Sequence, residues 1–256
     1  MGDNLGVILK GIESGQKTYV DKYSLSDLLL IFQKVCDAVS YAHSKSVLHL
    51  DLKPENIQVG DYGEVLLCDW GLGKIVNEED EEDFTADKQF NSDVLNDMTL
   101  HGIIKGTPGY MAPEQIAGGA KSIQTDIYAL GCILYRITAK QMPTSGDVDE
   151  VMKKTISGRW TPLLQVDKHI PGGLVAIVNK AMSLKEEERY SAVDLLNNDL
   201  RKYINGYAPE AENASFAKLL LLLFQRNKAL VSLILSFVIL AIAGLTVFIF
   251  RIAEEK

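Results

Sequence analysis

The chain has 256 residues, of which 47% are hydrophobic and 23% are charged, and its formal net charge is −8. This composition excludes collagen-like, low-complexity and wholly disordered proteins. The acidic balance excludes nucleic acid as an expected partner, because binding to phosphates needs a basic surface. The cysteines are few and lie far apart, which excludes a disulfide framework and is typical of a reducing compartment.

The first predicted elements are a helix and a group of short strands. Residues 1–23 have only a weak pattern. The segment Ser24–Ser44 has apolar residues at spacings of three and four, which predicts an amphipathic helix, and Ser24 with Asp27 resembles a capping box at its start. Short runs of β-forming residues then predict strands, with a turn at 60–63 between the last two: Val47–Leu48, Ile57–Val59 and Val65–Leu67.

The second half of the chain predicts helices. The run from Ile127 to Ile137 is almost wholly apolar and long enough to form a buried helix. Two further helices are expected at Leu174–Ser183 and Ser191–Tyr203.

An apolar stretch near the C-terminus differs from the rest of the chain. Its only polar residues between 229 and 250 are two serines and a threonine. As a helix this stretch is about 33 Å long, which is enough to cross a hydrocarbon core of about 30 Å. The alternative is a buried core helix, which rarely stays uncharged over such a length. We therefore predict a single transmembrane helix at 229–250.

The residues around this stretch predict how the chain meets the membrane. Residues 205–228 are expected to be a linker and a juxtamembrane segment, in which the apolar Leu219–Phe224 lies at the bilayer interface as a helix. Arg226 and Lys228 precede the span and Arg251 follows it, and this excess of positive charge places the N-terminal side in the cytoplasm. The short tail 251–256 is then expected on the far side.

Two segments carry the residue types that phosphoryl transfer needs: His49–Asn56 (H-L-D-L-K-P-E-N) and Asp69–Gly71 (D-W-G). A carboxylate orients or deprotonates the attacking hydroxyl, a cation contacts the transferred group, and oxygen ligands hold Mg²⁺ against the nucleotide phosphates. Pro54 and the glycine favour turns that bring such side chains together. The alternative interpretation is an ordinary surface turn.

Together these segments resemble the C-terminal lobe of a protein kinase, with the first as the catalytic loop and the second at the D-F-G position. Three further motifs follow in the family's order: Gly106–Glu114 resembles the end of an activation segment, Thr125–Gly131 the start of the central helix, and Glu188–Tyr190 the late arginine motif. The resemblance implies a mainly α fold (α+β overall), in which residues 1–204 form a kinase C-terminal lobe with small β-hairpins around the catalytic loop. The residues within these motifs, together with the predicted membrane span, resemble those of bacterial serine/threonine kinases.

The resemblance also implies roles for five residues in catalysis. Asp51 is implied as the catalytic base, Lys53 as the contact of the ATP γ-phosphate, and Thr107 as the residue that supports the substrate hydroxyl. Asn56 and Asp69 are implied as ligands of Mg²⁺, which together with ATP is the expected cofactor.

Three other matched residues have implied structural roles. Asp126 is expected to hydrogen-bond the backbone of the catalytic loop. Glu114 and Arg189 are expected to form a buried ion pair, and loss of one partner from such a pair costs about 3–5 kcal/mol.

The sequence departs from the family before the catalytic loop. The 48 residues that precede His49 contain no glycine-rich strand–turn–strand, strand lysine or partner glutamate, which are the parts that cover and anchor the ATP phosphates. We therefore expect a partial kinase domain without its N-terminal lobe, which is weakly active or inactive as a chain alone.

A second departure lies inside the catalytic loop. Leu50 stands where the family usually carries an arginine that binds a phosphorylated activation-segment residue. Leucine cannot pair with phosphate, so phosphorylation at Thr85, Ser92 or Thr99 is expected not to switch the protein through position 50. The acidic run Glu78–Asp83 is expected to be a solvated loop rather than a metal site.

We therefore predict a single-pass membrane serine/threonine protein kinase that transfers the γ-phosphoryl group of ATP to hydroxyls of a protein substrate. The alternative from another class is a membrane-tethered, non-catalytic docking or scaffold module. A third interpretation is an incomplete part of a longer gene, which we favour over a deliberate half-kinase. A homo-oligomer, or another chain that supplies the missing lobe, is the further partner expected.

Overall fold

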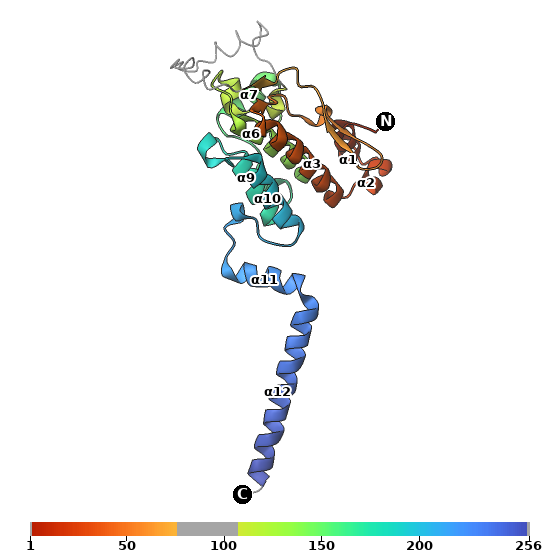
Figure 1. Cartoon of the computed structure of the whole chain (residues 1–256), viewed down its shortest axis with the longest axis vertical. Coiled ribbons are helices and arrows are strands. Elements are labelled where there is room, and N and C mark those ends of the chain that lie inside the picture. Colours follow the sequence, from red (N-terminus) through yellow and green to blue (C-terminus); the bar gives the residue numbers. More distant parts are fainter. Residues whose placement is uncertain (1, 76–106, 255–256) are drawn as a thin grey trace.

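The computed structural model describes residues 2–75 and 107–254. Figure 1 shows a helical lobe from which two helices, α11 and α12, lead away to the C-terminus. The fold is mostly helical with a few short strands, as the sequence predicts. The elements of the first range are α1 (Leu5–Glu13), α2 (Lys17–Lys22), α3 (Leu25–Ser44), β1 (Val47–Leu48), η1 (Pro54–Asn56), β2 (Ile57–Val59), β3 (Val65–Leu67) and β4 (Lys74–Ile75).

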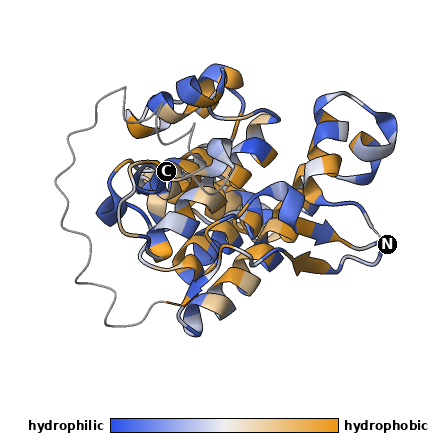
Figure 2. Ribbon diagram, turned by 90° about the horizontal axis from the view of Figure 1, so that it is seen from above, coloured by the Kyte–Doolittle hydropathy of each residue, from blue (hydrophilic) through white to orange (hydrophobic). Residues whose placement is uncertain are grey.

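The second range contains most of the helical core. Its elements are η3 (Pro108–Tyr110), α5 (Pro113–Ile116), α6 (Ile123–Ala139), α7 (Val148–Ile156), α8 (Leu163–Val166), α9 (Gly172–Ala181), η4 (Glu186–Glu188), α10 (Val193–Ile204), η5 (Glu210–Glu212), α11 (Phe216–Arg226) and α12 (Lys228–Glu254). Figure 2 shows that hydrophobic residues gather toward the middle of the lobe and hydrophilic residues toward its rim.

The N-terminal residues form two helices, α1 and α2, that the weak pattern of residues 1–23 did not predict. Four buried residues of α1 recur at the i, i+3, i+4, i+7 spacing of a helix face: Leu5, Ile8, Leu9 and Ile12. Asn4 caps this helix, since its Oδ1 accepts a hydrogen bond from the amide of Val7 at 2.9 Å. The sequence therefore carries the signal for α1, but over nine residues only.

Helix α3 begins as predicted. Ser24 is its N-cap, and Ser24 and Asp27 form the reciprocal hydrogen bonds of a capping box. The apolar face of α3 packs against α6 and α10, where Phe32 and Val35 are fully buried. This packing fixes α3 beside the central helix.

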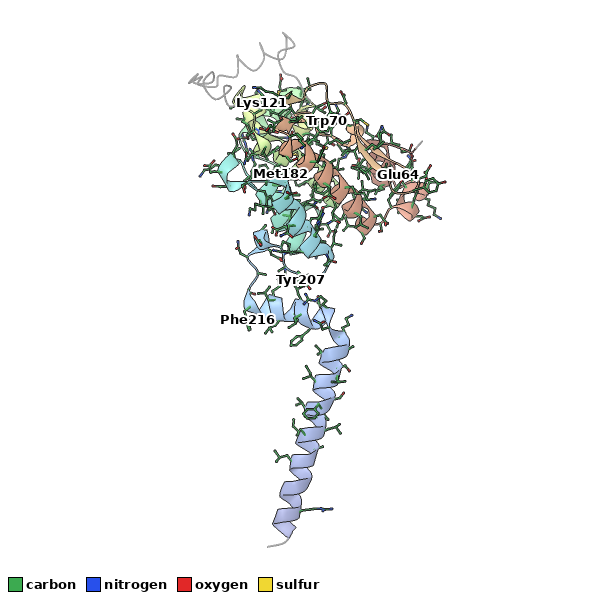
Figure 3. All side chains as sticks on the ribbon, viewed as in Figure 1. Glu64, Trp70, Lys121, Met182, Tyr207 and Phe216 are labelled. Carbon is green, nitrogen blue, oxygen red and sulfur yellow. The ribbon has the colours of Figure 1, made fainter. Side chains whose placement is uncertain are left out.

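Helix α6 is the buried centre of the lobe, and it contains the apolar run predicted at 127–137. It packs closely on α9 because Gly131 has no side chain. A Cβ atom at Gly131 would lie 2.9 Å from Ala181 Cβ and 2.8 Å from Met182 Cγ, which is closer than carbon atoms approach. Figure 3 labels Met182 within the lobe.

One antiparallel hairpin and a second antiparallel strand pair, whose strands are distant in the chain, flank the catalytic loop. Strand β2 pairs with β3, with Ile57 opposite Leu67, and β1 pairs with β4. Beyond the β2–β3 pair, the amide of Cys68 donates a hydrogen bond to the carbonyl of Asn56 at 2.8 Å. The hairpin therefore brings the backbone before Asp69 beside the end of the catalytic loop.

The segment after α10, predicted as a linker, is packed against the lobe. The buried carboxylate of Asp199 accepts hydrogen bonds from the amides of Glu210 at 2.6 Å and Ala211 at 2.9 Å, and from the Tyr190 hydroxyl at 2.9 Å. Because η5 also packs on α9, the chain leaves the lobe at a fixed point.

The two C-terminal helices meet at a sharp bend. Among the described residues, no single helix satisfies both the length and the apolarity of a membrane span. Helix α11 and the Val231–Thr246 part of α12 satisfy these conditions only when taken together, and they are bent by 96°. The span at 229–250 therefore stays a prediction.

Candidate active site

The catalytic loop is held by its backbone. One oxygen of Asp126 accepts a hydrogen bond from the amide of His49 and the other from the amide of Leu50, both at 2.8 Å. The Leu50 carbonyl accepts a third from Gln115 Nε2 at 3.0 Å. Leu50 has a φ of 63°, a left-handed conformation that is unfavourable for leucine. The predicted role of Asp126 agrees with this geometry, because its carboxylate holds the loop in a conformation the local sequence disfavours.

Three predicted catalytic side chains lie in contact at the turn after Leu50. Lys53 Nζ lies 2.7 Å from Asp51 Oδ2 and donates a hydrogen bond to Thr107 Oγ1 at 3.0 Å. Thr107 Oγ1 lies 3.4 Å from Asp51 Oδ1, which is a long contact for hydroxyl and carboxylate. The side chains of Asp51 and Lys53 are 10% and 21% exposed. A carboxylate, an ammonium and a hydroxyl thus lie together at a partly exposed part of the surface.

Asn56 joins the group from the end of η1, just before β2. Its Nδ2 donates hydrogen bonds to the carbonyl of Asp51 at 3.0 Å and to Asp51 Oδ2 at 3.3 Å. Its Oδ1 has no hydrogen-bond donor within the described part of the chain. The amide therefore orients Asp51 with its nitrogen and leaves its oxygen for a ligand.

Asp69 follows strand β3 of the β2–β3 hairpin. Among the described residues, its side chain forms no hydrogen bond with the other predicted site residues. It is exposed and has a φ of 61°. A Cβ atom at Gly71 would lie 3.2 Å from Asp69 Oδ1, so glycine keeps space beside this carboxylate. Of the predicted site residues, Asp69 is placed by the backbone alone.

The donor set suits Mg²⁺ and not a cage made wholly of protein. The described residues contain no group of three or more acidic, histidine or cysteine side chains that could hold a metal ion. Mg²⁺ commonly takes one or two protein oxygens and completes its octahedron with water and substrate phosphates. The free oxygens of Asn56 and Asp69 fit such a site.

His49 is a buried structural residue beneath the loop. It is fully buried, and its Nε2 lies 3.2 Å from the carbonyl oxygen of Cys68. Its ring packs on Trp70 with centroids 4.5 Å apart. Desolvation by burial lowers the pKa of His49 below its usual 6.5, so the ring is neutral near neutral pH.

Glu114 and Arg189 form the expected buried ion pair. Arg189 donates hydrogen bonds to both oxygens of Glu114, at 2.8 and 2.9 Å, and its side chain is fully buried. Its remaining donors reach the carbonyls of Ser183, Gln124 and Leu184. This pair ties the segment after Thr107 to the end of the lobe.

Two residues of the site were missed from the sequence. The ring of His43 lies 2.8 Å from Asp126 Oδ2, although its position in α3 carried no motif. Gln115 donates a hydrogen bond to the Leu50 carbonyl, but it lies just outside the motif that ends at its neighbour Glu114. The signal for both is tertiary, because each contacts a residue at least 65 positions away.

Several sequence predictions fall on residues that the structure leaves undescribed. Thr85, Ser92 and Thr99, and the acidic run Glu78–Asp83, lie outside the described ranges.

Comparison with known proteins adds to this geometry. Residues 6–200 match the family model described as protein kinase domain. Serine/threonine-protein kinase PknD of Protochlamydia amoebophila is 41% identical over 186 residues, which cover 72% of this chain and 19% of that protein. The proteins of the same name from Chlamydia caviae and Chlamydia pneumoniae are 35% and 36% identical, and the matches cover 82% and 80% of this chain but only 23% and 22% of those proteins. The chain spans about a fifth of the length of the curated relatives it matches.

Proposed function

Because this chain belongs to the protein kinase superfamily as a member of its bacterial serine/threonine branch, we propose that it forms the substrate-side half of a kinase active site. The reaction is transfer of the γ-phosphoryl group of ATP to a hydroxyl of a protein substrate. One observation carries the proposal: a carboxylate, an ammonium and a hydroxyl from Asp51, Lys53 and Thr107 lie within 2.7–3.4 Å of one another.

The two oxygens of Asp51 have different tasks in this proposal. Oδ2 accepts hydrogen bonds from Lys53 and Asn56, whereas Oδ1 has only the long contact with Thr107. Oδ1 is therefore the atom that orients the substrate hydroxyl and accepts its proton. The Thr107 hydroxyl, which lies beside Oδ1, supports the substrate oxygen from the other side.

Lys53 supplies the cation for the transferred group. Its ammonium has three donors, and two of them are used by Asp51 and Thr107. The third is free to contact a phosphate oxygen. Asn56 and Asp69 would hold Mg²⁺, which when bound neutralises charge on the ATP phosphates.

We propose further that these 256 residues alone have weak or no kinase activity, because the glycine-rich loop and the anchoring lysine are not among them. The test is to join the chain behind the N-terminal lobe of a serine/threonine kinase and to measure Mg-ATP-dependent phosphorylation of a protein substrate. We expect the chimera to be active, the chain alone to be near background, and Asp51→Asn to abolish the activity of the chimera.

Asp21→Asn is the matched control for this test. Asp21 is exposed on α2 and makes no hydrogen bond among the described residues, so the same change of charge there leaves activity unchanged. Strong turnover by the chain alone that Asp51→Asn abolishes would show that the missing elements are not needed. A folded chimera without activity would contradict the catalytic proposal.

We also propose that the kinase lobe is tethered to the membrane from the cytoplasmic side, with α12 as the anchor. Support comes from the apolar residues 229–250 and from side chains of α12 that are widely exposed, such as Phe237 at 73% and Leu240 at 70%. Flotation with lipid vesicles tests the anchor, and cleavage of the lobe by a protease added outside sealed cells tests its side. Recovery of the intact chain in the unfloated fraction would contradict the anchor.

A non-catalytic docking module is the second candidate function. One observation favours it: apolar side chains of strands β3 and β4 beside the catalytic loop are exposed, with Leu66 at 64% and Ile75 at 61%. The chimera separates the two functions, because a docking module needs no carboxylate at Asp51.

A further inference from the structure

Helix α11 has two different faces, and the lobe contacts only one of them. Lys218 and Leu222, one turn apart, line a cavity of about 340 Å³ between α11 and the lobe. The apolar residues on the other sides of the helix are widely exposed: Phe216 at 75%, Leu221 at 54%, Phe224 at 49%, Leu219 at 47% and Leu223 at 43%. A soluble protein seldom leaves such a helix face open to water.

We propose that α11 lies on the membrane surface, with its exposed apolar face at the boundary between lipid headgroups and acyl chains and the kinase lobe on its opposite face. This inference rests on the membrane anchor proposed above, and it adds how the lobe is held at the bilayer. Amphipathic helices bind in the plane of a membrane when one face is apolar and the flanking residues are basic.

The lobe side of α11 is fixed by three contacts. Lys218 forms an ion pair with Glu212 of η5. The guanidinium of Arg226 lies 3.8 Å from the ring centroid of Tyr207. Asp199 binds the amides of Glu210 and Ala211 and so holds the chain just before α11. The orientation of α11 relative to the lobe is therefore defined by contacts at both of its ends.

The direction of α12 matches the exposed face. Figure 1 shows that α12 leaves α11 on the side away from the lobe, and the bend between the two helices is 96°. Since Lys218 and Leu222 face the lobe, the opposite, apolar face of α11 turns toward the side that α12 enters. A helix along the membrane normal and a helix in the membrane plane meet at such an angle.

The charges of this region favour an anionic surface. Between Glu212 and Glu254 the sequence contains no acidic residue. Of its basic residues, Lys218 and Arg226 contact the lobe and Arg251 lies at the far end of α12, so Lys228 is the cation beside the exposed face of α11. Lys228 is exposed at the bend. Basic residues next to a span bind anionic headgroups, so the occupant of this face is a bilayer that contains acidic lipid.

This arrangement places the catalytic end away from the bilayer. In Figure 3, Trp70, which follows Asp69, lies at the end of the lobe opposite Phe216 of α11. A protein that projects from the membrane into the cytoplasm can therefore reach Asp51, whereas a lipid headgroup beneath α11 cannot.

Tryptophan scanning of the full chain in vesicles tests this inference. Phe216→Trp and Phe224→Trp place the probe on the exposed face, and Leu222→Trp is the matched control on the lobe face of the same helix. The parent chain corrects for Trp70 and Trp160. In vesicles of phosphatidylcholine and phosphatidylglycerol, we expect lipids brominated near the headgroup to quench most of the added emission at 216 and 224 and little at 222.

Each other outcome overturns a stated part of the inference. Equal quenching at 222 and 224 means that lipid surrounds α11 on all sides. If the chains float with the vesicles but the tryptophans at 216 and 224 are not quenched, α11 lies in water or against a second copy. Both results overturn the surface helix but leave the anchor intact, whereas failure to float overturns the anchor as well. Quenching that is equally strong in phosphatidylcholine alone overturns the preference for acidic lipid.

Discussion

Two ion pairs of nearly equal length in this lobe differ in the burial of their cations. Lys53 and Asp51 are 2.7 Å apart, and Arg189 and Glu114 are 2.8 Å apart. The two carboxylates are almost equally exposed, at 10% and 11%, but Lys53 is 21% exposed whereas Arg189 is fully buried. The difference between the pairs therefore lies in the cation.

The remaining donors explain what each cation can do. Arg189 makes three further hydrogen bonds to backbone carbonyls, so no donor can turn to a new partner without loss of a bond. Lys53 has a single further bond, to the Thr107 hydroxyl, and a side of its ammonium open to solvent. Nearly equal distances thus describe a fixed structural ion pair in one case and, in the other, a movable ion pair in the proposed catalytic site.

The largest effect is expected from the fixed pair. Arg189→Met leaves the Glu114 carboxylate buried without its cation, and such a loss lowers the free energy of unfolding by about 3–5 kcal/mol. Urea unfolding of the full chain in detergent, followed by tryptophan emission, measures this change. A loss below about 1 kcal/mol would mean that the pair is as weak as a surface ion pair, and the comparison would fail.

The double variant Glu114→Leu/Arg189→Met sharpens this result. With both charges removed, no buried charge is left unpaired, so we expect recovery of about half or more of the stability lost in the single variant. The Thr125 hydroxyl, which donates to Glu114 at 2.9 Å, loses its acceptor and limits the recovery. The same unfolding measurement gives the coupling between the two sites.

The movable pair is expected to show the reverse behaviour. Lys53→Met in the chimera with an N-terminal lobe lowers the phosphorylation rate by about 100- to 1,000-fold, as expected for loss of one electrostatic contact in the transition state. Its free energy of unfolding falls by less than in Arg189→Met, because Asp51 keeps the hydrogen bond from Asn56 Nδ2 and the cation that it loses is partly solvated. A variant that unfolds as readily as Arg189→Met would show that both pairs are structural.

The smallest effect concerns the pH dependence of stability beneath the movable pair. Burial lowers the folded-state pKa of His49 below 6.5, so the unfolded chain binds this proton more readily than the folded chain. Stability is therefore complete above about pH 6.5 and falls as the pH decreases below it. We expect His49→Gln to have a shallower loss of stability between neutral and mildly acidic pH than the parent, measured by urea unfolding, and an unchanged slope would contradict the role of burial.

Residues adjacent in sequence were the easiest to predict. Asp51, Lys53 and Asn56 lie within one motif, and the hairpin that carries Asp69 follows from short β-forming runs around a glycine turn. The resemblance to kinases pointed to Glu114, Asp126 and Arg189, whose partners are distant in the chain. His43 could not be found in this way, because a histidine on an amphipathic helix gives no sign that its ring meets a carboxylate 83 residues later.

Two segments are more ordered than their sequence pattern indicates, and the difference has a physical reason in each. Helix α1 is short, so its four buried apolar side chains gave a weak periodic signal. The segment after α10 has the glycine and proline of a linker, but a buried carboxylate on α10 binds its backbone, and composition does not reveal such a partner. Both segments lie at the edges of the lobe, where tertiary contacts outweigh local pattern.

The hydrogen bonds of Asp199 have a mechanical consequence. The amides of Glu210 and Ala211 bond to Asp199 of α10, and the Arg226 guanidinium packs on the Tyr207 ring. The chain between the lobe and the start of α12 is therefore held by contacts near both of its ends. Because the chain between the lobe and α12 is held by these contacts, we expect the lobe to turn together with α12 rather than independently of it.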